Sequence, residues 1–400
     1  MKKARTVIAR AALVPLMTGL LFVRLHAQQS GSPAKRIPVI VITDLYHPYQ
    51  DFGDNFDLVT AYALPEIDLK AVILDVTDAF RKPVADHPTL WRDPRGPREA
   101  GIIPVMQLNY IFNRNIPFAC GPFTPMRSPW DKMQDIPGFQ QEGIQLLLKT
   151  LRESPVPVEI LSFGSARPLA VAYNRSPALF RRKVKRIHLS AGTAAPDMRP
   201  GKDKGANAIP GGEWNVALDV NAFIRLLQSD LPVALYPCAT RDGAFVCGQH
   251  NTYWQLPGLS FIRTLPPKLH RYLTFAYNRT LRPDFLRAMD DNSAKDTTNY
   301  AHPHHVWETA LWIMVSGRKL VQRADGSCRL VPQDSLRPDD RIIPATLQPC
   351  TVKVRSDGRF SFSTTGRPSN FSIYYRQDPV QREKGLQEAL PALYKSYVYP

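Results

Sequence analysis

The chain has 400 residues, 44% of them hydrophobic and 22% charged, so it is long and apolar enough for one large α/β domain or two ordinary ones. Its 37 prolines, with aromatic residues at 10%, indicate ordered loops rather than a disordered chain. The net charge of +16 favours anionic partners. However, the densest basic run, Arg181 to Arg186, has no interleaved aromatic residue and is interpreted as solvated surface. Nucleic-acid binding is therefore not expected.

The N-terminus predicts an export signal over residues 1–27. Lys2, Lys3 and Arg5 are basic, Ala11–Val23 is apolar, and Leu25-His26-Ala27 resembles a cleavage site. The apolar stretch is short for a membrane span, although an uncleaved anchor is the alternative. No later segment has the pattern of a membrane span. We therefore expect a mature chain that is periplasmic or secreted.

Five cysteines follow this segment, and export permits disulfide bonds. The local pairings are Cys238 with Cys247 and Cys328 with Cys350, which leaves Cys120 unpaired. The spacings match no zinc motif.

The first elements form a β-loop-α-β unit. Ile37–Ile42 is a continuous, β-branched apolar run typical of a buried parallel strand, and it ends in Thr43-Asp44. Helical periodicity runs from Asp57 to Leu64. A second strand, Leu69–Leu74, also ends in an acid, Asp75.

The same alternation continues along the chain, with helices predicted at 140–151, 168–174 and 221–229 and strands at 156–162, 184–190 and 232–236. Alternating strands and helices predict an open, mostly parallel sheet with helices on both faces, an α/β fold.

Short alternating runs at Thr351–Val354 and Arg359–Phe362, separated by a turn, predict β-hairpins within residues 328–375. A last helix is predicted over about Val380–Tyr394. We interpret residues 36–400 as one domain with the hairpins as an appendage. A separate small β domain is the alternative.

Four aspartates lie within fourteen residues after the first strand: Asp44, Asp51, Asp54 and Asp57. Ligands of parallel α/β sheets bind beyond the carboxyl ends of the strands. Clustered carboxylates repel one another unless a cation offsets the charge, and oxygen-rich clusters suit Ca²⁺ or Mg²⁺. Helix capping is the alternative, but it explains one or two of these acids rather than four.

Residues 41–44 and 54–72, with an Asp-rich helix start and a Pro-Glu-Ile before the second strand, resemble the N-terminal signature of the nucleoside hydrolase superfamily, whose members include the inosine-uridine preferring enzymes. Three further segments are similar to that family in the same order: residues 161–170 with 187–192, residues 211–222 and residues 304–310. The resemblance covers roughly residues 38–315. It implies an open, largely parallel sheet that holds Ca²⁺, an enzyme that hydrolyses the N-glycosidic bond of nucleosides, and a homo-oligomer.

The resemblance also implies roles for individual residues. Asp44 is the expected general base and His304 the expected acid for the leaving base. The implied ligands of Ca²⁺ are Asp44, Asp51, Asp57, the Phe163 carbonyl and, at the position of a late acid, His305. The implied substrate-binding residues are Asp54, Asn207, Glu213, Asn215 and Trp214.

Two positions depart from the family pattern. Phe56 stands where a second acid is expected before Asp57, and His305 stands at the late acid although imidazole is a poor ligand for Ca²⁺. Asp296 or Glu308 is the alternative late acid. A sugar-binding protein that no longer hydrolyses, or a hydrolase of another glycoside, therefore remains as an alternative function.

Overall fold

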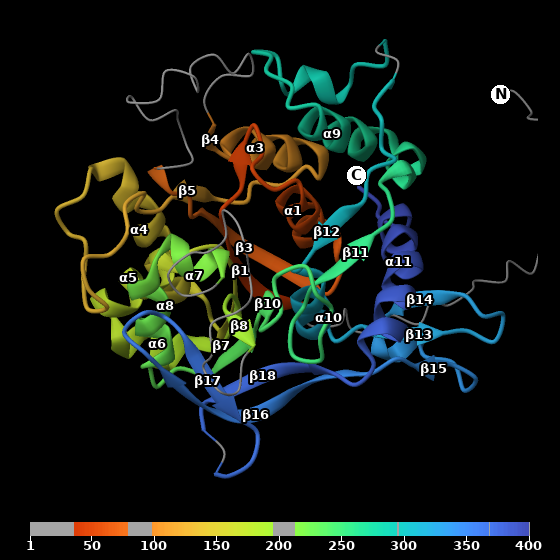
Figure 1. Ribbon diagram of the computed structural model, residues 1–400. Coiled ribbons are helices and arrows are strands. Elements are labelled where there is room, and N and C mark those ends of the chain that lie inside the picture. The colour runs from red at the N-terminus through yellow and green to blue at the C-terminus, as the bar shows by residue number, and fades with distance from the viewer. Residues whose placement is uncertain (1–35, 79–97, 195–212, 294–295, 368, 400) are drawn as a thin grey trace, which may run out of the picture. The chain divides into compact units, whose positions relative to one another are not determined.

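The computed structural model describes residues 36–78, 98–194, 213–293, 296–367 and 369–399 (Figure 1). Arg36–Pro400 forms one compact unit. The predicted export signal and Asn207 lie outside the described residues. No helix in the described part of the chain is both long and apolar enough to cross a membrane.

A nine-stranded sheet is the centre of the described structure. Its order is β17-β16-β18-β9-β7-β6-β1-β3-β5, and the strands from β18 to β5 are parallel. The strands are β1 (Ile37–Thr43), β3 (Ile67–Leu74), β5 (Phe118–Cys120), β6 (Val158–Phe163), β7 (Val184–Ser190), β9 (Val233–Tyr236), β16 (Ala345–Val354), β17 (Phe360–Ser363) and β18 (Phe371–Arg376). The open, mostly parallel sheet predicted from the sequence is confirmed.

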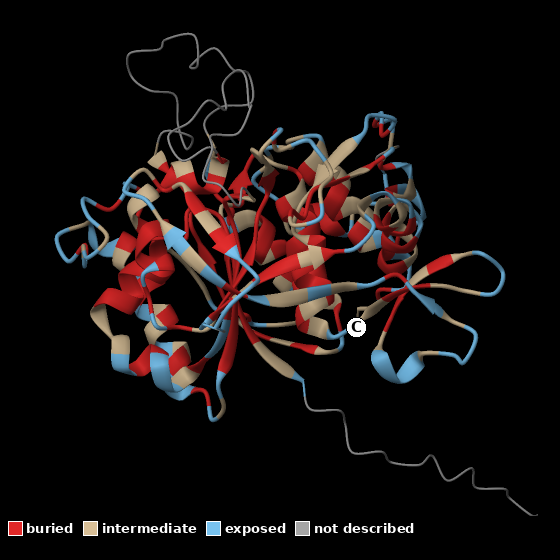
Figure 2. Ribbon diagram, turned by 60° about the horizontal axis from the view of Figure 1, so that its bottom comes forward, coloured by how far each residue is buried: buried red, intermediate tan, exposed pale blue. Residues whose placement is uncertain are grey.

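Each face of the sheet has its own hydrophobic core, because successive side chains of a strand point to opposite faces. Val39 and Val41 belong to one core, whereas Ile40 and Ile42 belong to the other. The first core is covered by α1 (Gly53–Ala63), α3 (Ile102–Ile111), α9 (Pro267–Tyr277), α10 (Thr309–Ser316) and α11 (Pro379–Lys395). The second is covered by α4 (Gly138–Glu153), α5 (Arg167–Arg175), α6 (Pro177–Lys183), α7 (Trp214–Leu218) and α8 (Val220–Leu227). Figure 2 shows the buried residues concentrated in the strands and in the helix surfaces that face them.

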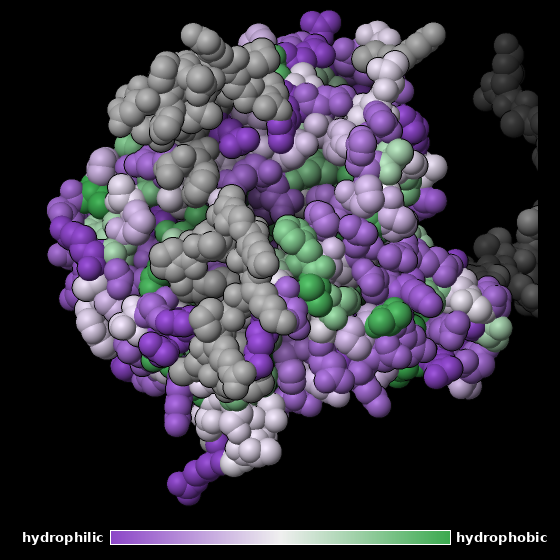
Figure 3. Space-filling view, viewed as in Figure 1, coloured by the Kyte–Doolittle hydropathy of each residue, from purple (hydrophilic) through white to green (hydrophobic). Residues whose placement is uncertain are grey.

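Short elements complete the described chain, mostly in the connections. They are β2 (Tyr46–His47), β4 (Glu99–Ala100), β8 (Thr193–Ala194), β10 (Ala239–Thr240), β11 (Trp254–Leu256), β12 (His304–Val306), β13 (Lys319–Gln322), β14 (Cys328–Val331), β15 (Arg341–Ile342) and the 3₁₀ helices η2 (Ser260–Thr264), η3 (Arg287–Met289) and η4 (Gln333–Ser335). On the face seen in Figure 3, the described surface is mostly hydrophilic, with hydrophobic residues in small separate groups.

The C-terminal hairpins are present, and part of them is built into the main sheet. Thr351 pairs with Ser363 in the antiparallel β16–β17 hairpin. Next along the sheet, β18 pairs with β16 on one side and runs parallel to β9 on the other. The hairpin strands therefore extend the sheet, while β13, β14 and β15 form a separate three-stranded sheet.

Two sequence expectations need correction. The first helix begins at Gly53 rather than Asp57, so Asp54 and Asp57 both lie inside it. Cys238, Cys247, Cys328 and Cys350 are all free thiols, so neither predicted disulfide forms. The local pairing followed from sequence distance alone, whereas the tertiary structure gives these thiols other surroundings: Cys238 is buried beside Ser190.

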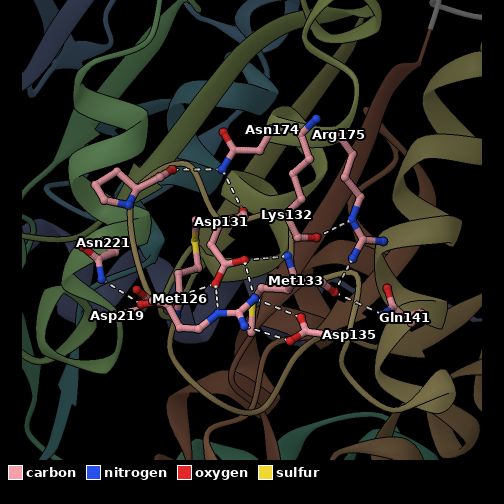
Figure 4. A network of polar contacts seen from close by, with 12 residues as sticks. Met126, Asp131, Lys132, Met133, Asp135, Gln141, Asn174, Arg175, Asp219 and Asn221 are labelled. Carbon is pink, nitrogen blue, oxygen red and sulfur yellow. Dashed lines mark hydrogen bonds and ion pairs between the residues drawn. The ribbon is translucent and has the colours of Figure 1, made fainter.

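The loop between β5 and α4 is held by side chains of α5 (Figure 4). Asn174 donates hydrogen bonds to the carbonyls of Pro129 and Asp131, and Arg175 donates to the carbonyls of Lys132 and Met133. Asn174 is buried, so these two hydrogen bonds fix the loop against α5 from within the protein.

Candidate functional site

Three strands of the sheet end side by side. In the parallel register Thr43 of β1 lies beside Leu74 of β3 and Phe163 of β6. The chain places β3 on one side of β1 and β6 on the other, so the winding of the sheet reverses here. Crevices at such reversal points are the ligand sites of open α/β sheets. Asp44 leaves β1 at this point.

A cavity of about 510 Å³ opens at this edge, and we call it the acid pocket. The sequence-predicted residues that line it are Asp44, Asp51, Asp54, Phe163, Glu213, Trp214, Asn215, His304 and His305. The structure thus brings together residues that come from four distant parts of the chain. A cavity of this size suits a small organic molecule.

The start of α1 delivers two of the acids. Asp51 Oδ1 accepts a hydrogen bond of 2.7 Å from the Gly53 N–H, which fixes the entry to the helix. A Cβ atom at Gly53 would lie 3.1 Å from Asp51 Oδ1 and 3.5 Å from His304 Nε2, so glycine allows both side chains to approach the helix. Asp54 follows one residue later and is buried on the pocket side.

Asp57, a predicted metal ligand, does not line the acid pocket. Its Oδ1 accepts a hydrogen bond of 2.9 Å from Trp312 Nε1, and it borders a small separate cavity with Thr309 and Tyr394. Burial, followed by the charge of Glu308, raises the pKa of Asp57. The side chain therefore lies behind the pocket, in contact with α10.

Glu308, the residue that precedes α10, supplies a late acid to the acid pocket. Its carboxylate accepts a hydrogen bond of 3.2 Å from the Ser190 hydroxyl at the end of β7. Burial, followed by the charge of Asp51, raises its pKa from 4.5 to about 8. Asp296, the other alternative, pairs with His270 at 2.9 Å and lies outside the pocket lining.

The two histidines come from β12, which pairs antiparallel with β11. His304 is partly buried, contacts the rings of Phe52 and Phe56, and has a lowered pKa because of desolvation. Its Nε2 has no hydrogen-bond partner among the described residues. His305 instead shares its Nδ1 with the Tyr253 hydroxyl at 2.9 Å.

His305 belongs to an aromatic group at one side of the pocket. Its ring centroid lies 4.7 Å from that of Phe245 and 6.2 Å from that of Trp307. Phe245 is 53% exposed, so this group presents an apolar surface toward solvent and the cavity. Aromatic rings arranged in this way are suited to contact another flat ring.

The acids of the pocket raise one another's pKa. Burial raises the pKa of Asp44, and the charges of Asp75, Asp51 and Glu308 add to the effect. Burial likewise raises the pKa of Asp54, with contributions from Asp44 and Asp51. Mutual repulsion of this kind is relieved by proton uptake or by a cation.

The segment around Glu213 is ordered by its own side chains. The Glu213 carboxylate accepts hydrogen bonds from the N–H groups of Gly192 at 2.7 Å, Asn215 at 3.0 Å and Val216 at 3.2 Å, and thereby caps α7. The Asn215 amide donates to the Ser190 carbonyl at 2.8 Å. Both side chains line the pocket with part of their hydrogen-bonding capacity already in use.

The donor set can be tested for a divalent cation. Among the described residues, no three or more His, Cys, Asp or Glu side chains are grouped closely enough to grip a metal ion as they stand. The pocket nevertheless offers several buried carboxylates and the Phe163 carbonyl, and its charges repel one another. Hard oxygen donors with excess negative charge fit Ca²⁺ or Mg²⁺ rather than a transition metal.

Sequence reasoning left Asp75 out of the site, although it ends β3 as Asp44 ends β1. Asp75 is fully buried, and its charge is the largest electrostatic influence on the pKa of Asp44. Burial raises the pKa of Asp75 itself to about 7. The sequence signal that could have identified Asp75 is its position directly after a strand. That signal points to the site only once the strand order shows that β3 lies beside β1.

The fold and the site define an α/β protein with an acidic pocket at the reversal point of its sheet. No family model matches the chain. Over 206 residues it is 28% identical to the pyrimidine-specific ribonucleoside hydrolase RihA of Citrobacter koseri and 27% identical to RihA of Salmonella typhi. The matched segment spans 50% of this chain and 59% of each relative, which is less than two thirds of their length.

Two solved structures share the fold. A plant nucleoside hydrolase has a TM-score of 0.50 at 15% identity, covering 89% of this chain and 99% of that one. A purine-preferring ribonucleoside hydrolase from Gardnerella vaginalis has a TM-score of 0.50 at 13% identity, covering 90% and 99%. These structures show that the chain shares the α/β fold of the two nucleoside hydrolases.

Proposed function

We propose that the chain is an exported N-ribosyl hydrolase that cleaves a nucleoside into ribose and free base with Ca²⁺ as cofactor. The observation that carries the proposal is the convergence of Asp44, Asp54 and Glu308 in one pocket at the sheet reversal. Buried acids with raised pKa values are typical of catalytic and cation-binding sites. The relatives' names, which are those of ribonucleoside hydrolases, support the reaction class.

Asp44, Asp51, Glu308 and the Phe163 carbonyl are the groups that would hold the cation. All four line the acid pocket and offer hard oxygen atoms. When bound, such a cation would lower the pKa of a water molecule and anchor the sugar hydroxyls. We assign to Glu308 the late-acid role for which the resemblance implies His305 and for which Glu308 was an alternative.

Asp44 is the proposed general base, because it follows β1 directly at the sheet reversal and lines the acid pocket. Asp54, Glu213 and Asn215 are the proposed partners of the ribose hydroxyls. Cleavage of the N-glycosidic bond leaves positive charge on the sugar. The negatively charged pocket stabilises that charge as it develops.

The leaving base requires a proton and a surface to lie against. His304 lines the pocket, and its imidazole, whose Nε2 has no hydrogen-bond partner among the described residues, is suited to donate the proton. Trp214, Phe245 and Trp307 line the same cavity and are proposed to pack against the flat base.

The test is ribose release from a panel of purine and pyrimidine nucleosides by the purified protein, with Ca²⁺ and after chelation. Release that is lost on chelation and lost in Asp44→Asn supports the proposal. Asp296→Asn is the matched control, since that acid lies outside the pocket lining. Release by Asp44→Asn at the rate of the unaltered protein contradicts the role of Asp44.

A second candidate is a nucleoside-binding protein that does not hydrolyse. The position of Asp57 against Trp312, away from the pocket, favours it because one expected acid is missing from the site. Calorimetry separates the two: heat of nucleoside binding without ribose release indicates a binding protein. The proposed export is tested by N-terminal sequencing of the full chain after expression, which is expected to begin after residue 27.

A further inference from the structure

The turn between β6 and α5, Phe163–Arg167, has a strained backbone. Ala166 adopts a left-handed conformation with φ of 58°, which the Cβ atom of an L-residue disfavours. At the start of the turn, Phe163 lines the acid pocket, and its carbonyl accepts a hydrogen bond of 3.3 Å from the Asp44 N–H. Strained conformations at functional sites persist only when the surrounding structure holds them.

Asp75 is the side chain that holds this turn. The Ser165 hydroxyl donates to its two oxygens, at 2.8 and 2.9 Å, and the Ala166 N–H also donates to its carboxylate. The Ser165 hydroxyl oxygen in turn accepts from the Arg167 N–H at 3.2 Å. Three consecutive residues of the turn are thus bound directly or indirectly to one fully buried carboxylate of the neighbouring strand.

Gly164 allows Asp75 and Asp44 to approach the turn together. A Cβ atom at this position would lie 3.1 Å from Asp75 Oδ2 and 3.2 Å from Asp44 Cβ. The turn, the proposed general base and Asp75 are therefore packed without room for another side chain, and a shift of the turn would move the pocket wall.

Arg167 anchors the other end of the turn. Its buried guanidinium pairs with Asp219 at 2.9 Å and donates to the carbonyls of Pro122 at 2.8 Å and Leu218 at 3.1 Å. Asp219 also accepts from the Met126 N–H at 2.8 Å (Figure 4). The far end is fixed by this network, so Asp75 decides the conformation of the residues next to the pocket.

We propose that Asp75 is a positioning residue: it holds Phe163–Arg167 in its strained form and thereby aims the Phe163 carbonyl at the acid pocket. Asp75 is not among the residues that line the pocket, so it acts through the turn and not on the substrate. The inference rests on the proposed function, because it concerns a carbonyl assigned there to the cation.

The test compares Asp75→Asn and Ser165→Ala, each of which removes part of the attachment, with Ser229→Ala. Ser229 is a matched buried serine that lies just beyond the end of α8. Its hydroxyl donates to the Leu226 carbonyl at 2.7 Å. Residues that orient metal ligands typically contribute 10- to 100-fold to metal affinity or activity. We expect both turn variants to lose about 10-fold or more in Ca²⁺ affinity by calorimetry and in kcat, and Ser229→Ala to lose only thermal stability.

A rescue variant distinguishes positioning from general stabilisation. Glycine adopts the φ of Ala166 without strain, so Ala166→Gly in the Asp75→Asn background is expected to recover a substantial part of the lost Ca²⁺ affinity. Asp75→Asn that keeps the Ca²⁺ affinity of the unaltered protein and loses only melting temperature would overturn the proposal.

Hydrogen exchange of the metal-free protein separates this inference from the proposed function. Faster exchange confined to the amides of Phe163–Arg167 in the turn variants supports the positioning role even if the unaltered protein releases no ribose. Exchange equal to that of the unaltered protein refutes it. Absence of both Ca²⁺ binding and ribose release in the unaltered protein is instead a failure of the proposed function.

Discussion

Replacing Glu308 with glutamine is expected to stabilise the protein when no divalent cation is present. The pKa of Glu308 is raised from 4.5 to about 8 by burial and by the charge of Asp51. The folded chain therefore holds a proton that the unfolded chain has lost at pH 7, and folding must take that proton up. Glutamine keeps the shape of the side chain and an oxygen to accept from Ser190, but it has no charge to desolvate.

The magnitude follows from the pKa difference. The gap between 4.5 and pH 7 corresponds to about 3 kcal/mol, at about 1.4 kcal/mol per pH unit. Neighbouring acids share the repulsion, so we expect Glu308→Gln to gain about 1–3 kcal/mol. Because the folded pKa is the higher one, the gain is largest above pH 8, shrinks as the pH falls and disappears below 4.5.

The assay is urea unfolding in chelator at pH 7 and pH 5, followed by circular dichroism, with unchanged m-values as the condition for comparison. Ca²⁺ at a hundred times its Kd stabilises a binding protein by about 2.7 kcal/mol, and this gain is expected for the unaltered chain but not for Glu308→Gln. Glu159→Gln is the control, for which the change in the free energy of unfolding is expected to have the opposite sign. Glu159 is buried, but His188 at 3.1 Å and Lys185 at 3.0 Å lower its pKa, so its loss is destabilising.

The reasoning is refuted if Glu308→Gln is less stable than the unaltered protein in chelator at pH 7. It is also refuted if both gain equally from Ca²⁺. The first result would mean that Glu308 is held by favourable contacts, and the second that it is not a ligand of the cation.

Three further predictions concern the core, the pH dependence and the pocket wall. Arg167→Met leaves the buried Asp219 without its ion-pair partner and is expected to cost about 3–5 kcal/mol in urea unfolding. Arg127→Met, which removes an exposed guanidinium from its ion pair, is expected to cost clearly less, and equal losses would contradict this. Burial lowers the pKa of His47 to about 4, so the unfolded chain binds the proton first and the melting temperature is expected to fall as the pH drops from 6.5 towards 4. His47→Gln removes this dependence, and a melting temperature that falls equally in that variant argues against it. Phe245→Ala is expected to raise KM for nucleosides with little change in kcat or melting temperature, because its half-exposed ring packs against the base without taking part in the chemistry; an unchanged KM excludes that contact.

The sequence determined the main strands and helices, the mostly parallel class of the sheet and the general location of the site. Strands such as Ile37–Thr43 are continuous apolar runs, and helices such as Gly138–Glu153 carry their own periodicity, so local chemistry suffices to place them. Acids directly after parallel strands converge whatever the details of packing, which is why Asp44 lies in the predicted pocket.

The tertiary structure decided which acids face the pocket. Asp54 and Asp57 are both in α1, three residues apart, and no sequence rule fixes how the helix is rotated about its axis; packing against α10 turns Asp57 toward Trp312. The choice among His305, Asp296 and Glu308 depended on the β11–β12 pairing and on the start of α10, contacts between segments remote in sequence.

The same reason explains Asp75, the hairpins and the cysteines. Asp75 belongs to the site because β3 lies beside β1, and β16 and β18 extend the sheet because β18 runs alongside β9. Sequence spacing gave a plausible Cys238–Cys247 pair, but the thiols pack against other partners in the folded chain. Periodicity and residue chemistry fix elements and their ends, whereas register, helix rotation and the pairing of distant segments are set by the free energy of packing the whole chain.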